Sequence, residues 1–226
     1  TQLANTITEY EFTIKESGAV ANTVYFFRLV NTAGNSPVGH NIGESYPSVS
    51  SQSGTLTFDI DGLPSSTNTS GITTTVDTTS TSVPFGSLLA SSSVAAAQRL
   101  TVTTNAGQGY SIYSYTPQGF VGQGADEIPP INGTNQSPVG WDSGCAANPA
   151  GCFGYHTSQP VLSGGSTRFA ADDTFAKFDT TPSEVDYSVG ATTSKSTDIV
   201  YRLQVRPLQE SGSYSTSVVY IVVPIF

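Results

Sequence analysis

Alternation of apolar and polar side chains with a period of two residues is the feature that most constrains the fold. Residues 6–14 place Tyr10, Phe12 and Ile14 on one face and glutamates on the other, and residues 54–61 alternate in the same way. Successive side chains of a strand point to opposite faces, whereas those of a helix repeat every 3.6 residues. Helical periodicity is nearly absent, so we expect an all-β chain.

Turn-forming residues predict how the strands are joined. Residues 98–104 and 110–115 flank a segment rich in Gly and Asn, and we expect them to form a hairpin. Residues 197–206 and 213–223 are expected to form a second hairpin around a Pro- and Gly-containing turn. Residues 91–97 (SSSVAAA) form the one helix-like patch, and we predict a turn there.

The number and spacing of these strands predict an antiparallel β-sandwich of Ig-like or jelly-roll type with long loop excursions. Residues 1–22 are expected to form an N-terminal strand and its tether, a candidate donor strand. Residues 23–226 are expected to form one elaborated sandwich, with a sub-boundary near residues 61–70. The longest loop excursion, residues 117–159, is rich in Gly and Pro, and such loops are usually functional or well packed.

The charge balance limits the classes of partner. Only 11% of the 226 residues are charged, and 8 basic residues stand against 17 acidic ones, for a net charge of −9. A nucleic-acid backbone or an anionic lipid surface would repel such a chain, so we predict no nucleic-acid partner. No run of 18 apolar residues exists, so we predict no membrane span.

Two observations predict export. The chain contains no Met, so we expect that it lost a signal peptide and that it lies outside the cell or on its surface. Cys145 and Cys152 stand close together in CAANPAGC, and in an exported protein such a pair indicates a local disulfide. A metal site would need more ligands nearby, so we predict no metal and no cofactor.

Residues suited to catalysis are scarce. His40 and His156 are the only histidines, and no Gly-x-Ser-x-Gly elbow exists. We therefore predict that the chain is not an enzyme. Asp59 and Asp61 offer oxygen atoms to calcium, but the ligands of a complete calcium loop do not follow, and a solvated strand end is the preferred interpretation.

Two further sets of residues are candidates for modification or binding. Asn68, Asn132 and Asn135 begin glycosylation sequons in predicted loops. Trp141 and Tyr155 offer an aromatic platform for a sugar, because aromatic rings combine a flat apolar face with a polar group. The alternative, which we prefer, is that these rings pack across strands and anchor a loop.

Three segments carry a resemblance to known proteins: VPFGSL from residue 83, LTVTTNAGQGYSI from residue 100 and YRLQVRPLQESGSY from residue 201. The region 83–226 resembles uncharacterised secreted proteins of uncultured candidate-phylum bacteria, which share these runs. More distantly it is similar to spore-coat-U-type pilin subunits. That resemblance implies an Ig-like subunit that assembles by donating a strand, although Thr103 and Thr104 stand where those pilins usually have a cysteine.

These observations favour an extracellular structural subunit of a surface filament, pilus-like fibre or surface layer that assembles by β-strand donation into a homopolymer. The donor would be residues 6–14, with Thr8, Tyr10, Phe12 and Ile14 filling pockets of a neighbouring copy. The alternative is an adhesin or carbohydrate-binding β-sandwich module that binds surface glycans through residues 117–159.

Overall fold

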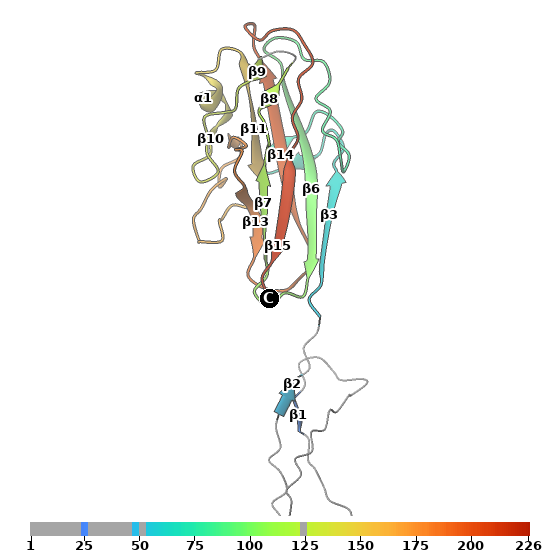
Figure 1. Ribbon diagram of the computed structural model, residues 1–226. Helices are drawn as coiled ribbons and strands as arrows, with labels where there is room; N and C mark the ends of the chain where they lie inside the picture. Colours follow the sequence, from blue (N-terminus) through green and yellow to red (C-terminus); the bar gives the residue numbers. More distant parts are fainter. Residues whose placement is uncertain (1–23, 27–46, 50–52, 123–125) are drawn as a thin grey trace, which may run out of the picture. The chain divides into compact units, whose positions relative to one another are not determined.

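The computed structural model describes residues 24–26, 47–49, 53–122 and 126–226 (Figure 1). It divides into two compact units, Thr1–Ser53 and Gly54–Phe226. In the first unit, strands β1 (Val24–Phe26) and β2 (Pro47–Val49) pair antiparallel. The predicted donor strand lies outside the described residues, with Thr8, Tyr10, Phe12 and Ile14.

The second unit is built around two antiparallel sheets (Figure 1). The order of the four-stranded sheet is β11 (Gly151–Thr157), β14 (Thr192–Val205), β6 (Ser93–Thr104) and β3 (Leu56–Gly62). The order of the three-stranded sheet is β13 (Ser183–Ser188), β7 (Tyr110–Tyr115) and β15 (Val219–Pro224). The all-β prediction is therefore confirmed, and so is the strand predicted at residues 54–61.

Short elements complete the unit. They are β4 (Asn68–Thr69), β5 (Ile72–Thr73), β8 (Phe120–Val121), β9 (Glu127–Ile128), β10 (Val139–Gly140), α1 (Trp141–Cys145) and β12 (Thr174–Phe175). No helix in the described part of the chain has the length and apolar character that crossing a membrane requires.

One hydrophobic core is shared by both sheets. Leu100 of β6 and Tyr201 of β14 come from the four-stranded sheet, while Tyr110 and Ile112 of β7 and Val185 of β13 come from the three-stranded sheet. All five side chains are almost completely buried. Removing this much apolar surface from water is the main stabilising contribution of the fold. The assignment to an Ig-like or jelly-roll sandwich stays a prediction.

A second core covers the opposite face of the four-stranded sheet. Because side chains alternate along a strand, Ala96 of β6 belongs to the first core, whereas Ala95 and Ala97 belong to the second. Trp141 and Phe175 pack over this second face. The four-stranded sheet is therefore buried on both sides.

The turn predicted at residues 91–97 is wrong, because these residues lead into and form the start of β6. Alanine favours helix in isolation, but propensity is a weak preference that packing overrides. The small side chains of Ala95 and Ala97 instead leave room for segments that cover the outer face of the sheet.

Both predicted hairpins are also wrong. β6 and β7 belong to different sheets, and so do β14 and β15. The chain therefore crosses between sheets at residues 105–109 and again at residues 206–218. Gly109 has a φ of +83°, and a Cβ atom there would lie 1.9 Å from the Ser188 carbonyl oxygen. Turn-forming residues do predict where the chain reverses direction, but they do not determine which strand the chain pairs with next.

Candidate functional site

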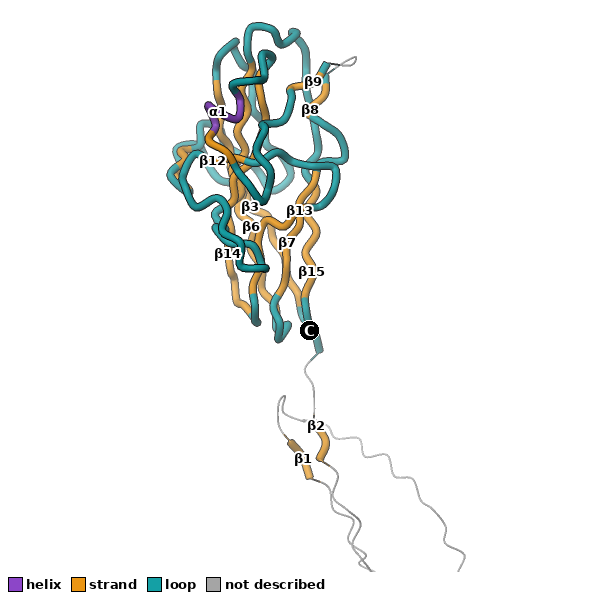
Figure 2. Tube along the Cα trace, turned by 90° about the vertical axis from the view of Figure 1, so that its left-hand side faces the viewer, coloured by secondary structure: helices purple, strands orange, loops and turns teal. Residues whose placement is uncertain are grey.

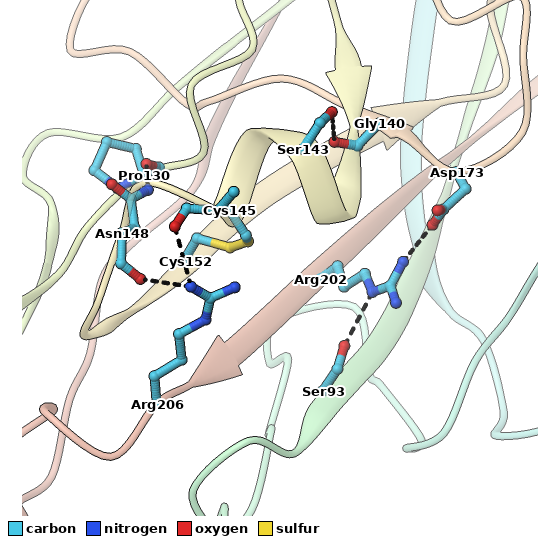
Figure 3. Close-up of a disulfide and its surroundings, with 11 residues drawn as sticks. Ser93, Pro130, Gly140, Ser143, Cys145, Asn148, Cys152, Asp173, Arg202 and Arg206 are labelled. Carbon is cyan, nitrogen blue, oxygen red and sulfur yellow. Dashed lines mark hydrogen bonds and ion pairs between the residues drawn. A yellow bond between two sulfur atoms is a disulfide. The ribbon is translucent and has the colours of Figure 1, made fainter.

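The Cys145–Cys152 disulfide is present and joins the end of α1 to β11 (Figure 3). Both cysteines are fully buried in the second core. Arg206 lies beside the bridge, and its Nη1 donates hydrogen bonds to the carbonyl oxygens of Ala146, at 3.4 Å, and Asn148, at 3.3 Å. The disulfide thus holds a local loop that also anchors Arg206.

The preferred interpretation of Trp141 and Tyr155 is confirmed, because both rings pack inside the protein, and the other possibility, an aromatic platform for a sugar, is wrong. Each side chain is only 1% exposed, so neither ring presents a face to a sugar in solution. Trp141 packs on Phe175, with ring centroids 5.0 Å apart, and the guanidinium of Arg202 lies 4.7 Å from its centroid. Tyr155 lies in the first core and donates a hydrogen bond to Asn135 Oδ1 at 2.8 Å.

The three sequons differ in their surroundings. Asn68 and Asn132 are exposed, and their glycosylation stays a prediction. The Nδ2 atom of Asn135, to which a glycan would be attached, instead donates a hydrogen bond of 2.9 Å to the Glu184 carbonyl oxygen. Its Oδ1 atom accepts from Arg168 at 2.9 Å. The structure therefore argues against glycosylation of Asn135.

The described residues show no group of three or more His, Cys, Asp or Glu side chains that would hold a metal ion. His156 is 1% exposed, and its Nδ1 lies 2.8 Å from the Thr174 carbonyl oxygen. Its ring packs against Phe169 and Phe175, with centroids 5.2 and 6.1 Å away. This histidine is therefore enclosed by the protein rather than open to a substrate.

The four-stranded and the three-stranded sheet each end in two edge strands, and unpaired edges can pair with other chains. The edge at β11 is covered by backbone. Tyr155 and Ala176 exchange two hydrogen bonds of 2.8 Å, and Phe153 bonds to Pro129 at 3.0 Å and to Ile131 at 2.9 Å.

The edge at β13 is covered by side chains. Donors from other parts of the chain reach the carbonyl oxygens of Glu184, Val185 and Tyr187. These donors are Arg168 and Asn135 for Glu184, Thr157 for Val185, and Lys195 and Gln159 for Tyr187. The edge at β3 has no partner strand among the described residues. Asp59 and Asp61 are exposed on it, and charged side chains discourage pairing at an edge.

The edge at β15 has none of these protections among the described residues. β15 pairs with β7 on one side, and Ser215 extends this pairing through hydrogen bonds of 2.9 and 3.1 Å with Val121. The other side of residues 215–224, called the free edge below, has no partner strand in the described part of the chain. Residues 213–226 contain no charged side chain. Ile221 and Val223 are 40% and 43% exposed.

The first core is incompletely covered beside the free edge. Thr157 of β11 bonds to Val185 of β13, so β11 and β13 flank one side of the unit and β3 and β15 the other. In Figure 1 the four-stranded sheet extends past β15 to β3, and Figure 2 shows β15 beside β7 from another side. The inward side chains of β3 and β15 are only half-buried although they pack against the first core: Phe58, Ile60, Tyr220 and Val222.

Tyr220 shows that this flank still shields polar groups from water. Its hydroxyl is hydrogen-bonded to the Tyr201 hydroxyl, which in turn donates to Gln98 Oε1 at 2.7 Å. Burial and the neighbouring Tyr201 raise the pKa of Tyr220 well above its ordinary value. The phenol therefore stays neutral and acts as a hydrogen-bonding group of the core.

A cavity of about 740 Å³ lies beside residues 213–216, where the free edge begins. It separates the segments 81–90 and 205–216. Its apolar lining includes Phe85, Phe120, Ile128, Leu203 and Tyr214. The rest of its lining is rich in Ser and Thr.

Backbone on one side of this cavity is unpaired. Residues 83–88 make no backbone hydrogen bond to any described strand. Yet Val83, Phe85 and Leu88 pack against the first core. The Phe85 ring lies 6.1 Å from Phe120, measured between centroids. The segment 83–88 thus fills part of the space between the sheets without joining either one.

Polar atoms also converge on the cavity. Tyr214 accepts a hydrogen bond of 2.7 Å from Gln209 Nε2 and donates one of 2.8 Å to the Glu210 carbonyl oxygen. The Oε1 atom of Gln209 is buried and has no hydrogen-bond partner among the described residues. A buried acceptor without a partner is costly.

No protein-family model matches the chain, and no curated protein matches it. The free edge and the cavity were not predicted from the sequence. The uncharged run at residues 213–226 is the sequence signal for the free edge, because it predicts an edge strand without charged protection.

Proposed function

We propose that this protein is an extracellular structural subunit of a surface filament, pilus-like fibre or surface layer that assembles by β-strand donation. Residues 6–14 of one copy are the donor, and the free edge of a second copy is the acceptor. The observation that carries this proposal is the free edge itself, which lacks charge and borders an incompletely covered core. The local disulfide is compatible with a protein outside the cell.

Donor and acceptor match in length and in pattern. The donor has nine residues, which would span about 30 Å when extended. The free edge has ten residues, of which Val219–Pro224 form strand β15. Backbone pairing along the free edge would supply affinity, and alternate side chains would supply specificity. Tyr10, Phe12 and Ile14 would face the half-buried core, leaving the glutamates in solvent.

The free edge also needs an explanation on grounds of solubility. An exposed apolar edge strand without charge or cover promotes uncontrolled aggregation. Three of the four sheet edges are protected by backbone, by side-chain donors or by acidic residues. The fourth would be protected once a neighbouring copy supplies a strand, which makes assembly specific.

Removal of residues 1–14 tests this function. We expect wild-type protein to form polymers whose size increases with concentration, and the truncated protein to remain monomeric and folded, because both cores lie in Gly54–Phe226. Sedimentation velocity would measure the size distribution. A full-length control with Glu9→Gln and Glu11→Gln, which face away from the apolar stripe, should still polymerise. Polymers of the truncated protein would rule out strand donation by residues 6–14.

A carbohydrate-binding module is the second candidate. The cavity supports it, because its volume lies within the range of about 300–1,000 Å³ that is usual for ligand pockets. Aromatic and hydroxyl groups together suit a neutral sugar. The site would then involve Phe120 and Tyr214 rather than Trp141. A glycan array compares wild type with Tyr214→Ala: specific binding that this substitution abolishes would favour an adhesin.

A further inference from the structure

We infer that the cavity between residues 81–90 and 205–216 is the anchor pocket of the acceptor, and that it takes the side chains of Phe12 and Ile14 from a second copy of this chain. This inference rests on the proposed function. It adds the place where the donor is recognised, and therefore what makes the interface specific.

Continuity with the free edge carries the inference. β15 pairs with β7 from Pro224 to Val219, and farther along the chain Ser215 forms an isolated bridge with Val121 of β8. Ser213, Tyr214, Ser215 and Thr216 all line the cavity. A strand that pairs along the whole free edge therefore passes the cavity at the Ser215 end. A donor strand that pairs with all of residues 215–224 therefore places some of its own side chains at the cavity.

The direction of the donor determines which side chains arrive there. Antiparallel pairs are slightly more stable per residue than parallel ones, and they are more common. In the antiparallel register of this inference, residue 6 lies opposite Pro224 and residue 14 lies opposite Thr216. Even-numbered residues of β15, such as Tyr220 and Val222, face the core. Side chains directly opposite in a pair share a face, so the even-numbered donor residues would face it too.

The lining of the cavity suits these side chains. Phe85, Phe120 and Leu203 provide an apolar floor for Phe12 and Ile14. The unpaired backbone of residues 83–88 lies across the cavity from residues 213–216. A donor strand that enters between them would meet backbone groups on both sides.

The charges around the cavity favour an uncharged occupant. Arg206 lines it, but its guanidinium is already bonded to the loop of the disulfide. Glu210 also lines it and is exposed. No buried charge lines the described wall of the cavity, so a charged side chain would lose its hydration without a buried partner. Phe12 and Ile14 carry no such cost.

A cavity-filling substitution tests the pocket in the full-length chain. Ser213 is exposed and lines the cavity, so Ser213→Trp should obstruct it without disturbing the cores. Ser166→Trp is the matched control, because Ser166 is exposed and lies outside the cavity lining. We expect Ser213→Trp to weaken self-association at least about tenfold, as measured by sedimentation velocity across a concentration series, and Ser166→Trp to leave it unchanged.

The results for wild type and Ser213→Trp distinguish a failure of the anchor pocket from a failure of strand donation. Wild-type polymers that are equally stable with Ser213→Trp would overturn the anchor pocket and leave strand donation intact. Wild-type protein that stays monomeric at all concentrations would overturn both. Loss of glycan binding with unchanged assembly in Ser213→Trp would assign the cavity to a sugar and likewise overturn the anchor pocket.

A cysteine pair tests the contact directly. Phe12→Cys and Ser213→Cys are introduced into separate full-length preparations, which are then mixed under mild oxidation. We expect a covalent dimer that contains one copy of each variant, identified by intact mass. Ser166→Cys in place of Ser213→Cys should give no such dimer. If both cysteines in one chain instead form an internal bond at high dilution, residue 12 reaches the cavity of its own copy and the second-copy assignment fails.

Discussion

At the scale of single residues, the flank formed by β11 and β13 depends on buried polar groups that are hydrogen-bonded to other residues of the protein. Asp186 is 1% exposed, and its carboxylate accepts hydrogen bonds from Tyr110 at 2.6 Å, Lys195 at 2.8 Å and Gln159 at 3.2 Å. Buried ionised groups are tolerated only when they are paired in this way. These contacts connect β13 with β7 and β14, and therefore join the two sheets.

Replacing Asp186 should be strongly destabilising. In Asp186→Ala the buried Tyr110 hydroxyl loses its acceptor, and the Lys195 ammonium keeps only the Tyr187 carbonyl oxygen and solvent. We expect a loss of about 3 kcal/mol in the free energy of unfolding. Asp179→Ala is the control, because its ion pair with Lys177 is well exposed and should contribute about 1 kcal/mol or less. Urea unfolding measures both. Equal losses would contradict the assigned role of Asp186.

His156 should make stability depend on pH. Burial lowers its pKa below the ordinary value of 6.5, and the hydrogen bond to Thr174 and the nearby carboxylates of Asp172 and Asp173 offset part of this effect. The unfolded chain therefore binds a proton first as the pH falls. The free energy of unfolding should decrease below about pH 6.5 and stop decreasing below the folded-state pKa.

The control for this pH dependence is His156→Gln, which removes the titrating group and keeps a polar side chain. Urea unfolding at pH 7.5 and at pH 5.0 should show a smaller difference between the two conditions for this variant than for wild type. The same difference in both proteins would show that His156 is not responsible.

At the scale of elements, the four edges of the two larger sheets differ in their charged residues and in the segments that pack against them. β11 is bonded to backbone, β13 to side chains, and β3 carries Asp59 and Asp61. β15 relies on none of these, although its outward side chains Ile221 and Val223 are apolar and exposed. A single charge on β15 should therefore have an effect that the same charge on β3 does not have.

Ile221→Lys should block assembly without unfolding the protein. Ile221 is 40% exposed and lies outside both cores, so the substitution removes little packing. A lysine on an edge strand discourages pairing. Thr57→Lys on β3 is the matched control, since Thr57 is also exposed on an edge strand. Sedimentation velocity should show monomers for Ile221→Lys and polymers for Thr57→Lys; polymers for both would exclude β15 as the acceptor.

Strand positions could be predicted from the sequence more reliably than strand partners. The alternation at residues 54–61 predicts β3, because burial of one face leaves a direct trace in the order of residues. Partner choice leaves no such local trace: β6 pairs with β14 and β3, which lie far from it along the chain. The packing of Trp141 agrees with the preferred interpretation of the sequence, but its partners Phe175 of β12 and Arg202 of β14 could not be predicted for the same reason.

At the scale of the whole molecule, the proposed assembly uses two different surfaces of the same chain as donor and acceptor. An interface between two different surfaces is heterologous, and it generates rings or open filaments rather than a closed symmetric dimer. The net charge of −9 opposes close approach of copies, so added salt should favour assembly by screening this repulsion. Neither property requires a ligand or a cofactor.

A mixing experiment tests the central claim most directly. One variant lacks residues 1–14 and keeps the free edge, and the other carries Ile221→Lys and keeps residues 6–14. Each alone should be monomeric, and an equimolar mixture should form a one-to-one dimer that grows no further, as measured by sedimentation velocity. A mixture that remains monomeric, while wild-type protein polymerises, would contradict strand donation from residues 6–14 to the free edge.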